Sequence, residues 1–338
     1  MFYITIVPGI IEIFQIAKHK EEQTTLYEGS RWYRGDAQVK EPFVTLFCSM
    51  KAFVGHNAVI QNNALDNWRS LSDVATILIG NDEGCAEAAA KRGFRHVTNV
   101  AASEYGTPLL SAMFSIAQQE AKTPLVCYIN GDILLPVNFA EQLCRVAKRL
   151  SRFLVIGERW DADITKPLSF DAAWDTRAIA RAAGAVVHSP TGMDYFAFPR
   201  GMVDYMPDFH VGRPGWDGWL HWKTRQMGIP VVDASATITI VHQNHSYRHV
   251  PHGNGQDWLG SPETAHNYSI LDEYPALDPL RNTIFHASHR LLLSGITTRP
   301  RFKRFVWHFQ LWFPRSLLAR GVLKLRNILR NILYLRSV

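Results

Sequence analysis

The chain has 338 residues, with 36 Lys and Arg against 30 Asp and Glu, which gives a formal charge of +6. Apolar residues make up 47% of it and charged residues 20%, a globular composition that excludes an intrinsically disordered chain. No run of about 20 uninterrupted apolar residues occurs, so a transmembrane helix is not expected. The apolar stretch 2–16 is interrupted by Pro8 and Glu12 and has no basic residues before it, which disfavours a secretory signal.

Basic residues are concentrated at the C-terminal end. Residues 299–338 contain ten Lys or Arg and no acid, so the rest carries 26 basic and 30 acidic residues, a net −4. This slightly acidic body disfavours nucleic acid as a partner. Within the tail, the pattern from 315 to 336 predicts an amphipathic helix. We expect the tail to contact an anionic membrane surface, the alternative being a helix packed on the main body.

The cysteines indicate a reducing compartment. Four are present, widely spaced and without a CxxC pair, and we expect free thiols in the cytoplasm. Together with the basic tail, this predicts a cytoplasmic protein that lies peripherally on the inner membrane face.

Short apolar runs alternate with longer amphipathic runs from residue 43 onward. The alternation predicts strands at 43–48, 74–80, 95–100, 125–129 and 153–157, and helices at 58–69, 84–92, 107–121 and 138–150. Such alternation is typical of a parallel sheet with helices on both faces. Ligands bind beyond the carboxyl ends of such strands, and two of these strands end in turns that contain Asp82 and Asp132.

The regularity weakens after residue 160. The remaining predicted elements are a helix at 172–183, a strand at 195–198, a loop at 208–218, a helix at 219–227 and short strands at 231–233 and 237–241. The segment 246–298 has no confident assignment beyond a helix that would carry His286 and His289.

Three groups of residues could carry chemistry. In Asn130-Gly131-Asp132, a carboxylate just past a buried strand can hold a divalent cation that neutralises a diphosphate, although such residues also form ordinary Asx turns. Asp217 lies between glycines and indoles, which could desolvate it for general-base work. The same residue could instead cap a helix while Trp216 and Trp219 fill the core.

The third group is rich in histidine. Four of the fourteen histidines fall between residues 242 and 252, beginning with His242 at the end of a predicted strand. A neutral imidazole there can ligate a metal, although clustered histidines also occur in polar loops.

The order and spacing of these motifs from Phe43 to His245 resemble a GT-A glycosyltransferase, especially the family 2 type. Asp82 matches the acid that contacts the nucleotide, and Asn130-Gly131-Asp132 matches the metal-binding Asp-x-Asp motif. Asp217 opens the expected Asp-x-x-Leu-x-x-(Lys/Arg) helix, and His242 follows where a metal or diphosphate ligand is usual. Two positions depart from the pattern, since Asn130 and Trp216 stand where acids are expected.

The resemblance implies a GT-A-like α/β fold with a mostly parallel sheet. It divides the chain into an N-terminal extension (1–40), a catalytic domain (41–298) and the basic amphipathic tail (299–338). The implied reaction moves a sugar from a nucleotide-diphospho-sugar to a hydroxyl of a glycan or lipid-linked acceptor, as in polysaccharide biosynthesis.

The resemblance also implies roles for individual residues. Mn²⁺ or Mg²⁺ would bind Asp132 and His242, and Asp217 would be the base of an inverting transfer. The other implied contacts are Asp82, Asn130 and Arg213 for the nucleotide-sugar, with Arg213 on a mobile loop, and Asp194 and Trp216 for the acceptor.

Two alternatives remain open from the sequence. A nucleotidyltransferase on a related fold would usually carry a Gly-rich loop after the first strand, where Ser49–Gly55 has a single glycine. A non-catalytic sugar- or lipid-binding relative would explain the two missing acids.

Overall fold

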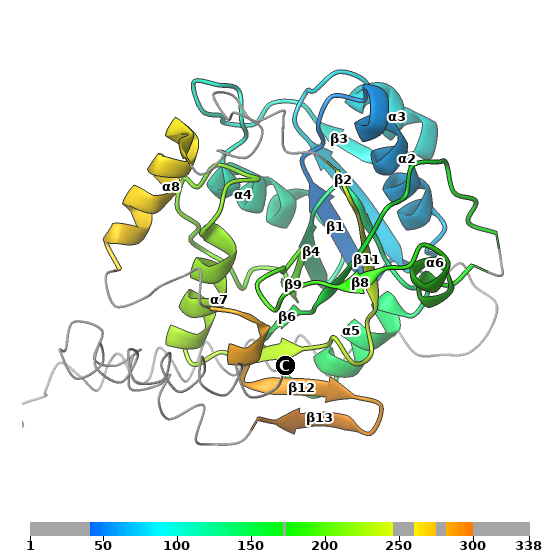
Figure 1. The fold of residues 1–338 in the computed structure, drawn as a ribbon. Helices are drawn as coiled ribbons and strands as arrows, with labels where there is room; N and C mark the ends of the chain where they lie inside the picture. The colour runs from blue at the N-terminus through cyan, green and yellow to red at the C-terminus, as the bar shows by residue number, and fades with distance from the viewer. Residues whose placement is uncertain (1–40, 172–173, 246–259, 275–281, 300–338) are drawn as a thin grey trace, which may run out of the picture. The chain divides into compact units, whose positions relative to one another are not determined.

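The computed structural model describes residues 41–171, 174–245, 260–274 and 282–299 (Figure 1). The predicted N-terminal extension and the basic tail beyond residue 299 lie outside these residues, as do 172–173, 246–259 and 275–281. Among the described residues, no helix is both long and apolar enough to cross a membrane. All four cysteines are described and are free thiols, as predicted.

A nine-stranded sheet forms the centre of the described part, in the order β13-β12-β10-β6-β9-β4-β1-β2-β3. Its strands are β1 (Val44–Cys48), β2 (Val74–Ile79), β3 (Arg95–Val97), β4 (Leu125–Ile129), β6 (Leu154–Ile156), β9 (Tyr195–Pro199), β10 (Val231–Asp233), β12 (His289–Leu292) and β13 (Gly295–Thr298). Neighbouring strands are parallel except for β9, which is antiparallel to β4 and β6, and β13, which is antiparallel to β12. The predicted mostly parallel α/β sheet is therefore confirmed.

Four short strands form a second sheet in the order β5-β11-β7-β8. They are β5 (Ile133–Leu134), β7 (Arg159–Ala162), β8 (Val186–Val187) and β11 (Ile240–Gln243). This sheet leads directly off the large one, because only three residues separate β4 from β5 and two separate β6 from β7.

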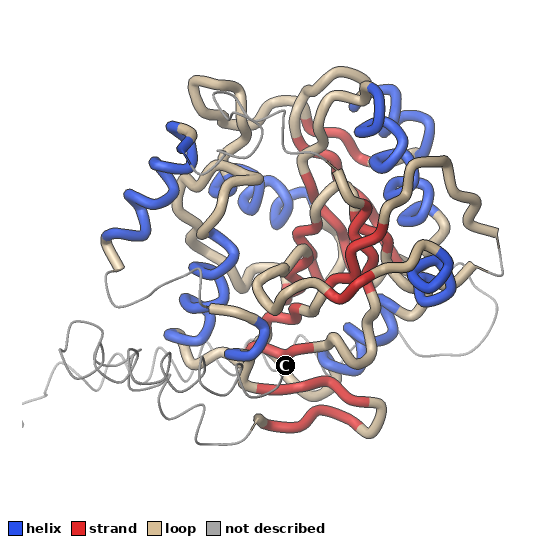
Figure 2. Tube along the Cα trace, in the orientation of Figure 1, coloured by secondary structure: helices blue, strands red, loops and turns tan. Residues whose placement is uncertain are grey.

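Helices cover both faces of the large sheet (Figures 1 and 2). They are α2 (Gly55–Arg69), α3 (Cys85–Arg92), α4 (Leu110–Glu120), α5 (Phe139–Ala147), α6 (Thr176–Ala182), α7 (Trp216–Gln226) and α8 (Pro262–Asp272), with a short 3-10 helix at Ile284–His286. Side chains of a strand alternate between its two faces. Leu46 and Cys48 accordingly pack with α2, α3 and α5, whereas Phe47 packs with α4 and α7.

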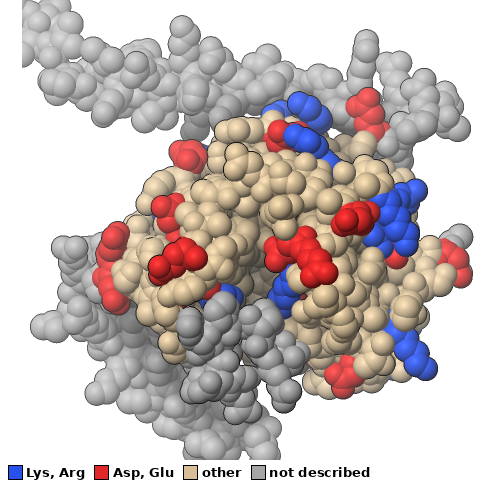
Figure 3. Space-filling model, turned by 90° about the horizontal axis from the view of Figure 1, so that it is seen from above, with Lys and Arg blue, Asp and Glu red and all other residues tan. Residues whose placement is uncertain are grey.

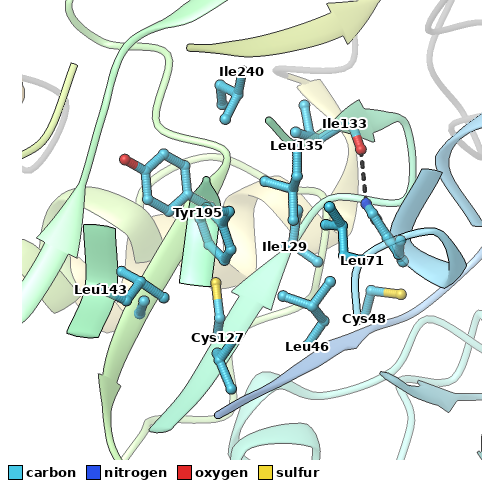
Figure 4. Close-up of a cluster of buried hydrophobic side chains, with 14 of the residues drawn as sticks. Leu46, Cys48, Leu71, Cys127, Ile129, Ile133, Leu135, Leu143, Tyr195 and Ile240 are labelled. Carbon is cyan, nitrogen blue, oxygen red and sulfur yellow. Dashed lines mark hydrogen bonds between the residues drawn. The ribbon is translucent and has the colours of Figure 1, made fainter. Parts of the chain in front are cut away.

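The core beneath α2 fixes the backbone next to Asp132. Apolar side chains from β1, β4 and β9 converge there, and the indole of Trp68 donates a hydrogen bond to the carbonyl of Ile133 at 2.9 Å (Figure 4). The Asn67 side chain pairs with both backbone groups of Leu135, at 2.7 and 3.2 Å. A buried helix therefore holds the chain segment that follows β4.

Several predicted elements need correction. Helix α4 begins at Leu110 rather than Thr107, because Pro108 and Leu109 are extended and pair with Ala102 and His210. The last predicted strand lies three residues later, at Ile240–Gln243.

Two further corrections concern the histidines and the helix that carries Asp217. His286 ends the 3-10 helix and His289 begins β12, so they do not share a helix. Helix α7 starts at Trp216, and Gly215 is its N-cap, at φ 104°. Asp217 is therefore in the first turn of the helix and does not cap it.

Candidate functional site

Asp132, His242 and His245 come together where the two sheets meet. Asp132 immediately precedes β5, and the antiparallel pairing of β5 with β11 places His242 opposite Ile133. The Gln243 side chain donates to the Asp132 carbonyl at 3.0 Å, which fixes this junction. Asp132 Oδ2 lies 3.0 Å from His245 Nε2 and 3.7 Å from His242 Nε2.

These three side chains fit a divalent cation. One ligand atom from each lies within 4.8 Å of the others. Asp132 Oδ1 is buried and has no hydrogen-bond partner among the described residues, so a carboxylate oxygen remains to be satisfied. A carboxylate with two imidazoles favours Mn²⁺ over Mg²⁺, because Mg²⁺ prefers oxygen ligands and keeps several waters.

Charges around Asp132 favour its ionised form. Burial by itself would raise the pKa of Asp132, but His242, His245 and Lys51 together lower it below its usual range. For His242, burial lowers the pKa, yet Asp132 and the Asp161 carboxylate outweigh burial and raise it. Seen from above, both acidic and basic side chains lie on the surface of the described part (Figure 3).

Lys51 is a site residue that the sequence analysis did not select. It lies in the turn after β1 and is half-buried. The pKa of Lys51 is lowered, mainly by burial and further by Arg213, although the Asp132 carboxylate acts in the opposite direction. The Gln61 side chain pairs with both backbone groups of Lys51, at 2.7 and 2.8 Å. The sequence does contain a clue to Lys51, because it is the one basic residue in the segment 49–55 that follows the first predicted strand.

Arg213, which the sequence places on a loop expected to be mobile, is buried and ion-paired in the structure. Only 7% of the residue is exposed, and its guanidinium pairs with Glu263 of α8, with Nε 3.0 Å from Oε2. Ser103 donates to the other Glu263 oxygen at 2.7 Å. The positive charge of Arg213 nevertheless acts on Lys51, so the two cations are near each other.

Asn130 faces Asp194 and not Asp132. Its amide donates to Asp194 Oδ1 at 2.6 Å, and its carbonyl oxygen accepts from the Tyr128 hydroxyl at 3.0 Å. The Arg159 guanidinium bonds both oxygens of Asp194, at 3.0 and 3.1 Å. An acid at position 130 would oppose a buried carboxylate, which explains why an amide stands there.

Gly131 packs closely against the Met50 side chain. A Cβ at this position would lie 2.7 Å from the sulfur of Met50, in the turn after β1. A side chain at position 131 would therefore require the end of the flexible Met50 side chain to move.

Asp217 has the electrostatic character of a general base. The backbone N–H of Gly218 donates to its Oδ1 at 2.8 Å. Burial, with a contribution from Asp194, raises the pKa of Asp217 to about 6. The phenol of Tyr128 lies near enough to Asp132, Asp194 and Asp217 that all three raise its pKa, although burial is the main cause.

The two residues expected at the acceptor are buried. Trp216 is 6% exposed, and its ring packs against Tyr128 and Phe196, with centroids 4.7 and 4.9 Å away. Asp194 is 3% exposed and is engaged by Asn130 and Arg159. Both therefore support neighbouring side chains, and sequence reasoning did not select Arg159.

Asp82 lies apart from the other predicted residues. It is exposed, follows β2, and is separated from β4 by β1 in the sheet. Although the residue as a whole is exposed, its carboxyl is partly desolvated, and this raises its pKa. Because β1, β2 and β4 are parallel, Asp82 is at the same sheet edge as Asp132, but none of its described contacts reaches Asp132, Asp217 or His242.

Comparison with known proteins gives distant similarity in structure. No protein-family model matches the chain, and neither does any curated protein. Similar solved structures include mannosyltransferase PcManGT from Pyrobaculum calidifontis in complex with GDP-Man and Mn²⁺ (15% identity, 74% of this chain and 70% of that one, TM-score 0.39). Another is glucosyl-3-phosphoglycerate synthase from M. tuberculosis (13% identity, 75% and 83%, TM-score 0.41).

Proposed function

We propose that the chain is a glycosyltransferase that moves a sugar from a nucleotide-diphospho-sugar to a hydroxyl acceptor. The observation that carries the proposal is the grouping of Asp132, His242 and His245 beside Lys51 at the carboxyl edge of the sheet. A site that combines cation ligands with a nearby ammonium suits a diphosphate leaving group.

The donor half of the site contains Lys51, Arg213 and the three cation ligands. A divalent cation bound by Asp132, His242 and His245 would neutralise charge on the departing diphosphate. Lys51 and Arg213 supply further positive charge, and Glu263 keeps the Arg213 guanidinium oriented. Asp82, farther along the same edge, is proposed to contact the base or ribose.

The acceptor half depends on Asp217. A pKa of about 6 leaves the Asp217 carboxylate ionised at neutral pH. Because this pKa is close to the working pH, the carboxylate can accept a proton efficiently. The acceptor oxygen would attack the anomeric carbon as the bond to the diphosphate breaks, and the hydroxyl proton would pass to Asp217. A single displacement of this kind inverts the anomeric centre.

A panel of nucleoside diphosphates tests the proposal. We expect one of them to raise the melting temperature of the full chain, and to raise it further with Mn²⁺, because a ligand that binds only the native state stabilises it. Replacing the exposed Asp204 with Ala should leave this shift unchanged, whereas Asp132→Ala should remove its Mn²⁺-dependent part. No shift with any nucleoside diphosphate in the presence of Mn²⁺ would contradict the function.

We also propose that residues 299–338 place the enzyme on an anionic membrane surface, where a lipid-linked acceptor would be available. This segment contains ten basic residues and no acid, which supports the proposal. Electrostatic attraction to an anionic membrane contributes about 1 kcal/mol of binding free energy for each basic residue near the surface. The intact chain should co-sediment with anionic liposomes, and the chain ending at residue 298 should not. Equal co-sedimentation of the two would exclude this role for the tail.

A further inference from the structure

A carboxylate outside the predicted site faces one of the proposed cation ligands. Asp161 of β7 is paired in register with His242 of β11. Asp161 Oδ1 lies 3.1 Å from His242 Nδ1, while His242 Nε2 is directed to Asp132, 3.7 Å away. The imidazole is therefore held between two carboxylates, one at each nitrogen.

Asp161 is itself contacted by the Arg159 guanidinium and the His188 imidazole. Arg159 Nε lies 2.9 Å from Asp161 Oδ1, and His188 Nδ1 contacts Asp161 Oδ2. The same Arg159 bonds both oxygens of Asp194. One guanidinium thus joins the carboxylate behind His242 to the carboxylate that holds Asn130.

The surroundings leave this arrangement little room to relax. A Cβ at Gly192 would lie 2.4 Å from the His188 ring and 3.2 Å from Arg159 Nε. Only 12% of the Arg159 side chain and 23% of the Asp161 side chain are exposed. The contacts of Asp161 with Arg159 and His188 are therefore partly shielded from solvent.

We propose that Asp161 is a positioning residue that fixes the His242 imidazole for cation binding; this inference depends on the proposed function. Asp161 lies on the Nδ1 side of the ring, so its negative charge favours a proton on Nδ1 and leaves the lone pair of Nε2 on the same side as Asp132. A carboxylate behind a ligating imidazole also makes the imidazole a stronger ligand. Arg159 acts one step farther out, by holding Asp161.

Calorimetric titration of the full chain with Mn²⁺, without donor or acceptor, tests this role. Asp161→Asn should weaken Mn²⁺ binding about 10- to 100-fold, the usual effect of removing such a partner. Asp66→Asn is the matched control, because Asp66 also pairs with a buried arginine, Arg92, and none of its contacts within the described part of the chain is with a histidine. The Mn²⁺ affinity of this variant should equal the wild-type value. Equal affinity of Asp161→Asn and wild type would overturn the proposal.

Imidazole ¹⁵N NMR provides a second readout that does not depend on the metal. At a pH high enough for His242 to be neutral, its proton should be on Nδ1 in the wild type, and Asp161→Glu should retain this tautomer more than Asp161→Asn does. A proton on Nε2 in the wild type would overturn the inference even if Asp161→Asn does not fold. If the wild type has the Nδ1 tautomer but does not bind Mn²⁺, the result would instead contradict the proposed cation site.

Discussion

The strands of the nine-stranded sheet and those of the four-stranded sheet differ in what they bury. Strand β4 is apolar and fully buried, and both its faces are covered by helices. Strands β7 and β11 instead contribute Asp161 and His242, which contact each other across the small sheet. The large sheet therefore fixes the backbone of the site, and the small sheet supplies much of its charge. Substitutions in the two sheets should have separable effects on stability and on ligand binding.

The largest effect is expected at the junction of the two sheets. Asp132→Ala removes the carboxylate shared by both imidazoles and should abolish measurable Mn²⁺ binding, together with transfer. Calorimetry with Mn²⁺ measures the first effect, and product formation measures the second. The exposed control Asp204→Ala should retain both. Wild-type Mn²⁺ affinity in Asp132→Ala would show that the cation binds elsewhere.

Asp217→Asn should lower the transfer rate by about 10²- to 10⁴-fold while nucleotide binding is retained, as expected for loss of a general base. The wild-type rate should rise with pH through a midpoint of about 6, because burial raises the pKa of Asp217 and only the ionised form accepts a proton. Glu87→Gln, which alters an acid in the first turn of α3, is the matched control. Equal rates for Asp217→Asn and wild type would refute the role.

A change in the large sheet's core should alter stability without altering ligand affinity. Phe114 is buried against Phe47 and Phe198, and Phe114→Ala should cost about 3–5 kcal/mol of unfolding free energy. The half-exposed Phe285→Ala should cost far less. Denaturant unfolding measures both, and Mn²⁺ affinity of folded Phe114→Ala should be unchanged. If Phe114→Ala also lost Mn²⁺ affinity, this would contradict the proposal that the large sheet affects stability without affecting ligand binding.

Restoring the acid expected at position 130 should be unfavourable. Asn130→Asp would oppose Asp194, and we expect a loss of about 1–3 kcal/mol at neutral pH, because a half-buried donor is replaced by a like charge. The loss should diminish as pH falls, since repulsion raises the pKa of the new carboxyl and protonation relieves it. Asn62→Asp is the matched control, because Asn62 Oδ1 accepts from Arg92 and we expect a carboxylate to be tolerated beside this guanidinium. Greater stability of Asn130→Asp at neutral pH would contradict this account.

The sequence predicts the large sheet better than the small one for a physical reason. Strands such as Leu125–Ile129 are buried on both faces and therefore appear as continuous apolar runs. Strands β5 and β8 have two residues each, too few for any period to be visible. Their pairing depends on where the large sheet places them, and a local sequence pattern does not contain this information.

The same difference applies to the site. Asp132 and His242 could be selected because each follows or ends an apolar run. Asp161 and Arg159 lie in a strand without a clear pattern, and only the register of β7 with β11 brings Asp161 to His242. Arg213 looked mobile in a loop rich in Gly and Pro, but its partner Glu263 is 50 residues away in the chain. Contacts across such distances leave no local pattern.

The central claim is that Asp132, His242 and His245 jointly bind a divalent cation at the junction of the two sheets. Anomalous diffraction from crystals of the full chain soaked in Mn²⁺ tests it most directly. The account predicts a manganese peak in contact with Asp132 and both imidazoles, with Asp161 behind His242. A peak away from all three side chains, or no peak at saturating Mn²⁺, would contradict it.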